Sequence, residues 1–190
     1  MRHFTLSTID KLDGEMADAV LNPGKVDVVT RVKELTGGAG MDIVAEVMRE
    51  IGYKSAYVFH GLTANGKAGM DEISTLGPIV YCRFEQRGDL ESFILQPEEM
   101  GIKKATAEEL APHGSPEDEA LGLVRVLSGK ANGARVDAVC LNAAPMFLLA
   151  GRVEQIKAGV ELARELVFSG KAIVKLQEWV SCQNLDSDLV

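Results

Sequence analysis

The chain has 190 residues, a formal net charge of −8 and a hydrophobic fraction of 46%, values typical of one soluble globular domain rather than a disordered or fibrous protein. The acidic balance argues against a nucleic-acid backbone or an anionic lipid surface as partner, and no apolar run reaches the roughly 18 residues that a membrane span needs. The three cysteines, Cys82, Cys140 and Cys182, lack metal-ligand spacing and are interpreted as reduced thiols of a cytoplasmic protein.

The N-terminal part of the chain has the weakest pattern. Residues 1–20 are interpreted as an arm or edge element of unknown role, and residues 21–190 as one partial α/β domain. Near the start of that domain, the β-branched run Val26–Val32 predicts a strand.

A helix and a buried strand are predicted next. The helix runs from about Asp42 to Gly52, because three apolar residues share one face at steps of four: Ile43, Val47 and Ile51. The strand Ser55–Phe59 is apolar at almost every position. This is the pattern of a strand that is buried on both faces of a parallel sheet.

The remaining sequence predicts a hairpin and then a helical C-terminal half. Two segments of alternating polarity, Ile79–Glu85 and Glu91–Gln96, flank a turn-forming stretch and are typical of a β-hairpin. A short helix is predicted at residues 97–101, with longer ones at 115–129, 136–150, 152–168 and 171–180. The predicted fold class is therefore α/β, with a small, mostly parallel sheet, a β-hairpin and a helical C-terminal half.

The first candidate site follows the predicted strand Ser55–Phe59. His60 and Gly61 stand where that strand ends, and a glycine-rich loop leads from them to Asp71 and Glu72. Ligands of open α/β sheets bind beyond the carboxyl ends of strands. Adjacent carboxylates suit Mg²⁺, which takes one or two of them together with water and phosphate oxygens. His60 has two interpretations, as a donor to a phosphate or carboxylate and as a structural histidine.

Two considerations limit the metal hypothesis. With 28 acidic residues among 190, about four adjacent acidic pairs are expected by chance, and the sequence contains five. Neighbouring side chains of an extended strand also face opposite ways, so both acids serve one ion only if the backbone turns there or two ions bind. The Asp71–Glu72 pair therefore indicates a metal site only if the surrounding sequence also supports one.

Three other features are interpreted as structural. Thr36–Gly40 precedes a helix but lacks the lysine of a P-loop and the GxGxxG spacing, so it is interpreted as a turn. Asn142 lies in an apolar helix, and we expect its side chain to hydrogen-bond to a neighbouring turn. No nucleophile elbow surrounds Ser74, so nothing in the sequence indicates a covalent intermediate.

The stretch from Val58 to Pro78 carries a family motif. It resembles the "V-x-H-G … G-x-D-E-x-S … G-P" signature of anthranilate phosphoribosyltransferases, in the order Val58-Phe59-His60-Gly61, Gly69-Met70-Asp71-Glu72-Ile73-Ser74 and Gly77-Pro78. Further pieces resemble the family in the same order: Leu21-Asn22-Pro23, residues 45–52, Pro97-Glu98, Met100-Gly101, Leu127-Ser128-Gly129, Leu141-Asn142-Ala143-Ala144 and Ser169-Gly170-Lys171-Ala172. Each piece is weak alone, whereas their common order over residues 21–181 is specific.

The resemblance implies a metal-dependent phosphoribosyl transfer. The family condenses anthranilate with phosphoribosyl pyrophosphate in tryptophan biosynthesis, on a fold similar to that of the pyrimidine nucleoside phosphorylases. Its D-E pair binds Mg²⁺ on the pyrophosphate, a role that the resemblance transfers to Asp71 and Glu72, while His60 and Gly61 become candidates for substrate contact. The cation would neutralise the charge that develops on the leaving group.

The resemblance covers only the C-terminal part of the family's catalytic domain. The helical N-terminal domain, the "G-T-G-G-D" loop that holds the pyrophosphate and the "K-H-G-N" segment have no counterpart. Three hypotheses follow: a short form that retains the magnesium half-site, a non-catalytic structural or regulatory relative, and a nucleoside phosphorylase-like protein. The D-E pair favours the first over the third. The expected partner is a second copy or a chain that supplies the missing half.

Overall fold

The computed structural model of the chain describes residues 4–6, 19–21, 40–64, 68–70, 72–85 and 88–183. Near the N-terminus, two short strands pair in parallel, β1 (Phe4–Leu6) and β2 (Ala19–Leu21). The predicted strand Val26–Val32 and most of the predicted turn Thr36–Gly40 lie outside the described residues. No helix within the described ranges is long and apolar enough to cross a membrane.

A four-stranded sheet forms the centre of the fold. Its strands are β3 (Ser55–Leu62), β4 (Ala68–Met70), β5 (Ile79–Glu85) and β6 (Glu91–Leu95), in the order β4-β3-β5-β6. The α/β class and the predicted hairpin, now β5–β6, are confirmed. The mostly parallel arrangement is wrong for this sheet, because every neighbouring pair in it is antiparallel. The chain returns from β3 through β4 and a loop, without the crossover helix that parallel neighbours require.

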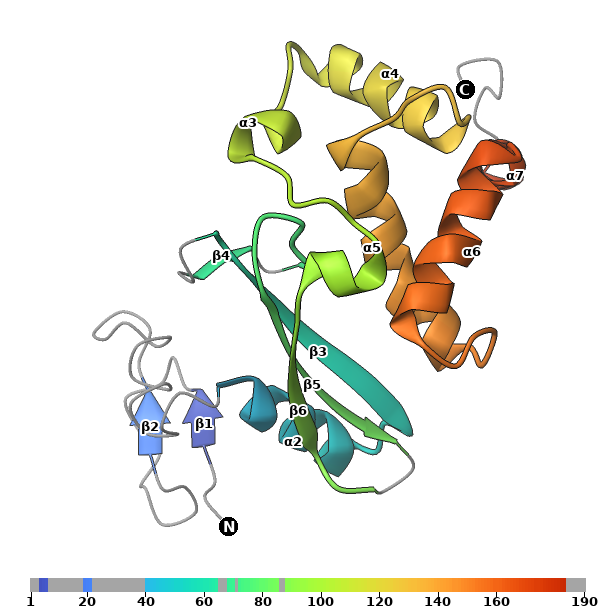
Figure 1. Cartoon of the computed structure of the whole chain (residues 1–190). Coiled ribbons are helices and arrows are strands. Elements are labelled where there is room, and N and C mark those ends of the chain that lie inside the picture. Colours follow the sequence, from blue (N-terminus) through green and yellow to red (C-terminus); the bar gives the residue numbers. More distant parts are fainter. Residues whose placement is uncertain are drawn as a thin grey trace.

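Helix α2 (Gly40–Ile51) packs on one face of this sheet, as Figure 1 shows. Its Ala45 and Met48 contact a small cluster of sheet residues: Ala56, Val58, Cys82 and Phe84. The predicted apolar stripe is not the packed one, because Val47 is 48% exposed and Ile51 is 70% exposed. A spacing of four residues identifies a helical face but not the neighbour that covers it. Here the fully buried Ala45 allows the helix to approach the sheet closely.

The C-terminal helices gather on the other side of the sheet (Figure 1). They follow one another as η2 (Pro97–Met100), α3 (Ala107–Leu110), α4 (Pro116–Leu127), α5 (Ala134–Leu149), α6 (Ile156–Phe168) and α7 (Lys171–Cys182). Local signals set the start of α4, where Ser115 accepts a hydrogen bond from the Asp118 amide and Pro116 takes the first position. The predicted helices are confirmed.

The main core lies between α5, α6 and the sheet. Apolar side chains of the two helices meet sheet residues there, among them Val136, Cys140, Leu141, Val160, Ala163, Val167 and Ile79. Helix α5 continues through Pro145, which is buried. Although the sequence of this helix is apolar on almost every face, its last turn is not buried all round, because Met146 is 71% exposed.

The cysteines differ in accessibility, which predicts a simple labelling pattern. Cys82 and Cys140 are buried and Cys182 is exposed, and burial raises the pKa of the Cys140 thiol, which disfavours the reactive thiolate. We therefore expect a thiol reagent such as Ellman's reagent to label one cysteine quickly in the folded protein and all three only after unfolding. Cys182→Ser should remove the fast phase, and a fast phase that persists in this variant would contradict the buried positions.

Candidate functional site

The candidate site lies where β3, β4 and the loop at residues 72–78 meet. Strand β4 ends at Met70, and Glu72 already stands at a bend in the chain. Asp71 lies outside the described residues. Because the chain has left the strand by Glu72, this acid is free of the strand alternation that would separate two neighbouring carboxylates. The Glu72 side chain is exposed, and it forms no ion pair or hydrogen bond with another described residue.

Gly61 brings strand β3 into direct contact with this loop. A Cβ atom at Gly61 would lie 2.5 Å from the Ser74 Cβ and 2.6 Å from the Glu72 carbonyl oxygen. Only a residue without a side chain permits backbones to approach so closely. The structure therefore places the predicted Gly61 and Glu72 side by side, although they are eleven positions apart in the chain.

His60 lies elsewhere than the sequence predicted. Strand β3 continues to Leu62, so His60 and Gly61 belong to the strand rather than to a loop after it. Strand alternation places His60 on the face of Val58, which packs towards α2, and Gly61 on the opposite face. The His60 Nε2 is buried and has no hydrogen-bond partner among the described residues. The Gly61 backbone, rather than the His60 imidazole, is thus the part of this pair that meets Glu72.

The rest of the loop is fixed by hydrogen bonds. Ser74 and Thr75 are fully buried. The Leu76 amide donates to the Ser74 Oγ over 2.9 Å, and the Ala105 amide donates to the Thr75 carbonyl over 2.9 Å. The loop is therefore held both by its own side chain and by the chain that follows η2, and it gives the exposed Glu72 a rigid base.

Asn142 of α5 adds a contact that the sequence did not reveal. Its Oδ1 accepts from the Ile73 amide over 3.1 Å, and its Nδ2 donates to the Ile73 carbonyl over 2.9 Å and to the Ala138 carbonyl over 3.0 Å. The bond to Ala138 is the expected contact with a neighbouring helical turn. The bonds to Ile73 span 69 sequence positions, and their only sequence signal was an amide in an apolar helix that needed partners.

The donor set at this place suits a hard divalent cation. Glu72 offers a free carboxylate, and its neighbour Asp71 is a second carboxylate. Within the described residues, no group of three or more His, Cys, Asp or Glu side chains is placed to hold a metal. Mg²⁺ in proteins is typically held by one or two carboxylates together with water and phosphate oxygens, so this acid pair has suitable chemistry for such an ion.

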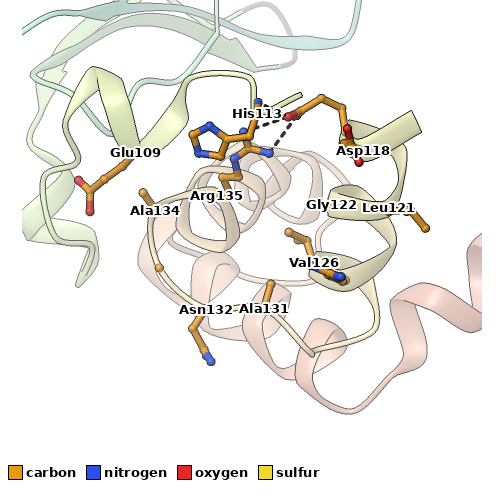
Figure 2. A pocket seen from close by; sticks show the side chains of 13 residues that line it. Glu109, His113, Asp118, Leu121, Gly122, Val126, Ala131, Asn132, Ala134 and Arg135 are labelled. Atoms are coloured by element: carbon orange, nitrogen blue, oxygen red, sulfur yellow. Dashed lines mark hydrogen bonds and ion pairs between the residues drawn. The ribbon is translucent and has the colours of Figure 1, made fainter. Parts of the chain in front are cut away.

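The hollow of about 530 Å³ between α3, α4 and the start of α5 is a separate feature, and none of the predicted site residues lines it. Figure 2 shows His113 and Arg135 together at its edge. Glu119 accepts from the His113 amide and pairs with Arg135 over 2.9 Å. The His113 amide and the Arg135 guanidinium lower the pKa of Glu119. Because Glu119 of α4 and Arg135 of α5 are paired with each other, we interpret this cluster as a structural contact that holds the two helices together.

A second hollow, of about 300 Å³, lies on the sheet face that the C-terminal helices cover. Tyr57 and Tyr81 line it with ring centroids 6.1 Å apart, and Tyr81 also stacks on Phe93 at 5.0 Å. Burial raises the pKa of both tyrosines, so they stay neutral at ordinary pH. The stacked rings come from the three strands β3, β5 and β6, so we interpret them as cross-strand packing rather than as a binding site.

Comparisons with known proteins agree with the site motif. Residues 4–173 match the family model described as "Glycosyl transferase family, a/b domain". The anthranilate phosphoribosyltransferase of Methanococcoides burtonii is 37% identical over 139 residues, which are 73% of this chain and 37% of that protein. The chain thus spans well under half the length of this relative.

Solved structures of anthranilate phosphoribosyltransferases share the fold. The anthranilate phosphoribosyltransferase of Thermus thermophilus superposes with a TM-score of 0.62 at 34% identity, over 74% of this chain and 39% of that one. The Saccharomyces cerevisiae enzyme in complex with PRPP and Mg has a TM-score of 0.54 at 24% identity, over 66% of this chain and 34% of that one, a likeness of fold alone. Because the family model spans residues 4–173, the chain belongs to the glycosyl transferase family with this a/b domain.

Proposed function

We propose that this chain is the magnesium-binding part of an anthranilate phosphoribosyltransferase. The observation that carries the proposal is the position of Glu72, which leaves β4 at a bend, rests with its backbone against Gly61 and keeps its carboxylate exposed and unpaired among the described residues. The relatives with this name support the choice of reaction, and the Asp71–Glu72 pair in the family motif supports the choice of metal.

In the proposed reaction, the amine of anthranilate forms a bond to the sugar carbon and gives up a proton, while the bond from that carbon to the pyrophosphate oxygen breaks and its electron pair leaves with the pyrophosphate. Asp71 and Glu72 would hold Mg²⁺, which when bound neutralises charge on the departing pyrophosphate. Gly61 keeps the loop close to β3, so the carboxylate of Glu72 starts from a fixed backbone. A substrate contact of His60 would have to come from the face of β3 that packs towards α2, where its buried Nε2 lies without a partner among the described residues.

The site needs polypeptide beyond these residues. No segment here resembles the family loop that holds the pyrophosphate. Among the described strands, none pairs with the outer edge of β3 over Ser55–His60, and Val44 and Val47 of α2 are about half exposed. An open edge beside an apolar helix face supports an interface with the complementary half of the enzyme. We place this assembly in the cytoplasm, where the free thiols would stay reduced.

The absent loop also favours a second candidate function, that of a non-catalytic structural or regulatory relative. Anthranilate fluorescence separates the two candidates. We expect no fluorescence loss when this chain alone is mixed with anthranilate, phosphoribosyl pyrophosphate and Mg²⁺, and turnover once the complementary half is added. Rapid turnover by the chain alone would show that the missing parts are dispensable. No turnover with the complementary half present would favour the non-catalytic relative.

A further inference from the structure

Asn142 uses its whole amide group to hold one residue of the acidic loop. The two protons of its Nδ2 go to the carbonyls of Ile73 and Ala138, and its Oδ1 takes the amide proton of Ile73. Both polar groups of the Ile73 backbone are therefore bound by a single side chain of α5. The same residue is anchored by its own side chain, since Ile73 is only 5% exposed and belongs to the main core.

The position of Ile73 makes this contact relevant to the proposed metal site. The Ile73 amide belongs to the peptide bond whose carbonyl is that of Glu72, so Asn142 fixes the plane of that peptide. The Glu72 carbonyl oxygen rests against Gly61 of β3 on its other side. The backbone of Glu72 is thus held between the sheet and α5, while its carboxylate stays exposed.

The neighbouring anchors do not duplicate the one from Asn142. Upstream, β4 pairs with β3 only as far as Met70. Downstream, the bonds of Ser74 and Thr75 act after Ile73. The loop residues described between Met70 and Ser74 are Glu72 and Ile73. Among the described side chains, that of Asn142 is the one that hydrogen-bonds their backbone.

We propose that Asn142 is a positioning residue for the metal site: through the Ile73 peptide it holds Glu72 in the orientation that binds the divalent cation. This rests on the proposed function. Mg²⁺ demands nearly ideal octahedral geometry, so a small displacement of one carboxylate lowers affinity. Removal of a side chain that hydrogen-bonds and orients a metal ligand typically lowers metal affinity about 10- to 100-fold. We expect a loss of that size here.

The test measures Mn²⁺, a paramagnetic substitute for Mg²⁺, by electron paramagnetic resonance in the presence of phosphoribosyl pyrophosphate. The wild-type chain is compared with Asn142→Leu, which keeps the branched shape and the number of side-chain heavy atoms but removes all three hydrogen bonds. Val167→Ala is the matched control, since it shortens a buried core side chain of α6. We expect Asn142→Leu to weaken Mn²⁺ binding at least about tenfold, and Val167→Ala to leave it unchanged even where it lowers the melting temperature.

A second variant answers the case in which Asn142→Leu does not fold. In Asn142→Asp the partly buried carboxylate faces the carbonyl oxygens of Ile73 and Ala138, and both their partial negative charges and the partial burial raise its pKa. Once protonated, it regains a donor for one of them. We expect its Mn²⁺ affinity, relative to wild type at the same pH, to be lowest near pH 8 and to recover towards pH 6. A purely structural residue would give a ratio that does not depend on pH.

The outcomes separate the two proposals. If the wild type binds Mn²⁺ and the Asn142 variants bind it equally well, the positioning role is wrong and the proposed function stands. If Val167→Ala weakens binding as much as Asn142→Leu does, the effect is one of general stability and the role is likewise wrong. Because no segment of the chain resembles the loop that holds the pyrophosphate, we expect the wild type to bind Mn²⁺ only weakly. If it binds none at all, the metal site itself is absent, and both proposals fail together.

Discussion

Asp71→Ala is expected to abolish the magnesium-dependent binding of phosphoribosyl pyrophosphate. The substitution removes one of two carboxylates that the proposal assigns to the cation. Residues that only orient metal ligands cost about 10- to 100-fold in affinity when changed, so loss of a direct ligand should exceed about 100-fold. Titration calorimetry with and without Mg²⁺ measures this loss. The wild-type heat of binding should itself depend on the metal.

Glu50→Ala provides the matched control for this loss. Glu50 is an exposed acid of α2, so its removal changes the net charge of the chain by the same amount. We expect this variant to bind like wild type, because a charge effect that acts at long range is screened at physiological salt. Equal weakening by both substitutions would mean that general electrostatics, not coordination, governs the binding. Wild-type binding that is unaffected by Mg²⁺ would reject the assignment altogether.

Gly61→Ala is expected to destabilise the fold by about 3 kcal/mol, the upper part of the usual range for overpacking. The new Cβ would meet the Ser74 Cβ at 2.5 Å, the Glu72 carbonyl oxygen at 2.6 Å and the Ser74 amide nitrogen at 2.9 Å. Two of these atoms are backbone and cannot be relieved by a change of rotamer. The loop must move, and Mg²⁺-dependent binding should weaken with it. Urea unfolding gives the free energy of unfolding.

Gly122→Ala makes the same chemical change where the structure has room. Gly122 lies inside α4, and a Cβ there would come no closer than 3.5 Å to the Arg135 Nη1. Alanine is favoured over glycine in a helix by roughly 1 kcal/mol, so this variant should be slightly more stable than wild type. If Gly61→Ala were as stable as Gly122→Ala, the loop could not be wedged against β3 as described.

The parts of the fold that could be predicted from sequence are those set by neighbouring residues. Ser115 and Pro116 determine the start of α4 through local capping, and the alternation of two short segments determined the β5–β6 hairpin. The direction of strand pairing could not be predicted, because an apolar run such as Ser55–Phe59 fits burial in either kind of sheet. The packed face of α2 depended on how closely Ala45 approaches Cys82 and Phe84, which no helical period encodes.

The candidate site shows the same limit. The motif located Gly61 and Glu72, and the structure places them in contact. The prediction that His60 follows its strand was wrong, since β3 runs two residues beyond it and turns the imidazole to the other face. The contact from Asn142 to Ile73 joins residues 69 positions apart. Such a contact depends on tertiary packing, and only the expectation that a buried amide is hydrogen-bonded pointed to it.

Anomalous diffraction of crystals grown with Mn²⁺ and phosphoribosyl pyrophosphate tests the metal site most directly. We expect an anomalous peak at the acid pair, with carboxylate oxygens of Asp71 and Glu72 and oxygens of the diphosphate at ligand distance, about 2.1 Å. A peak at another place, or carboxylates that pair with lysine or arginine while the diphosphate binds without metal, would contradict it.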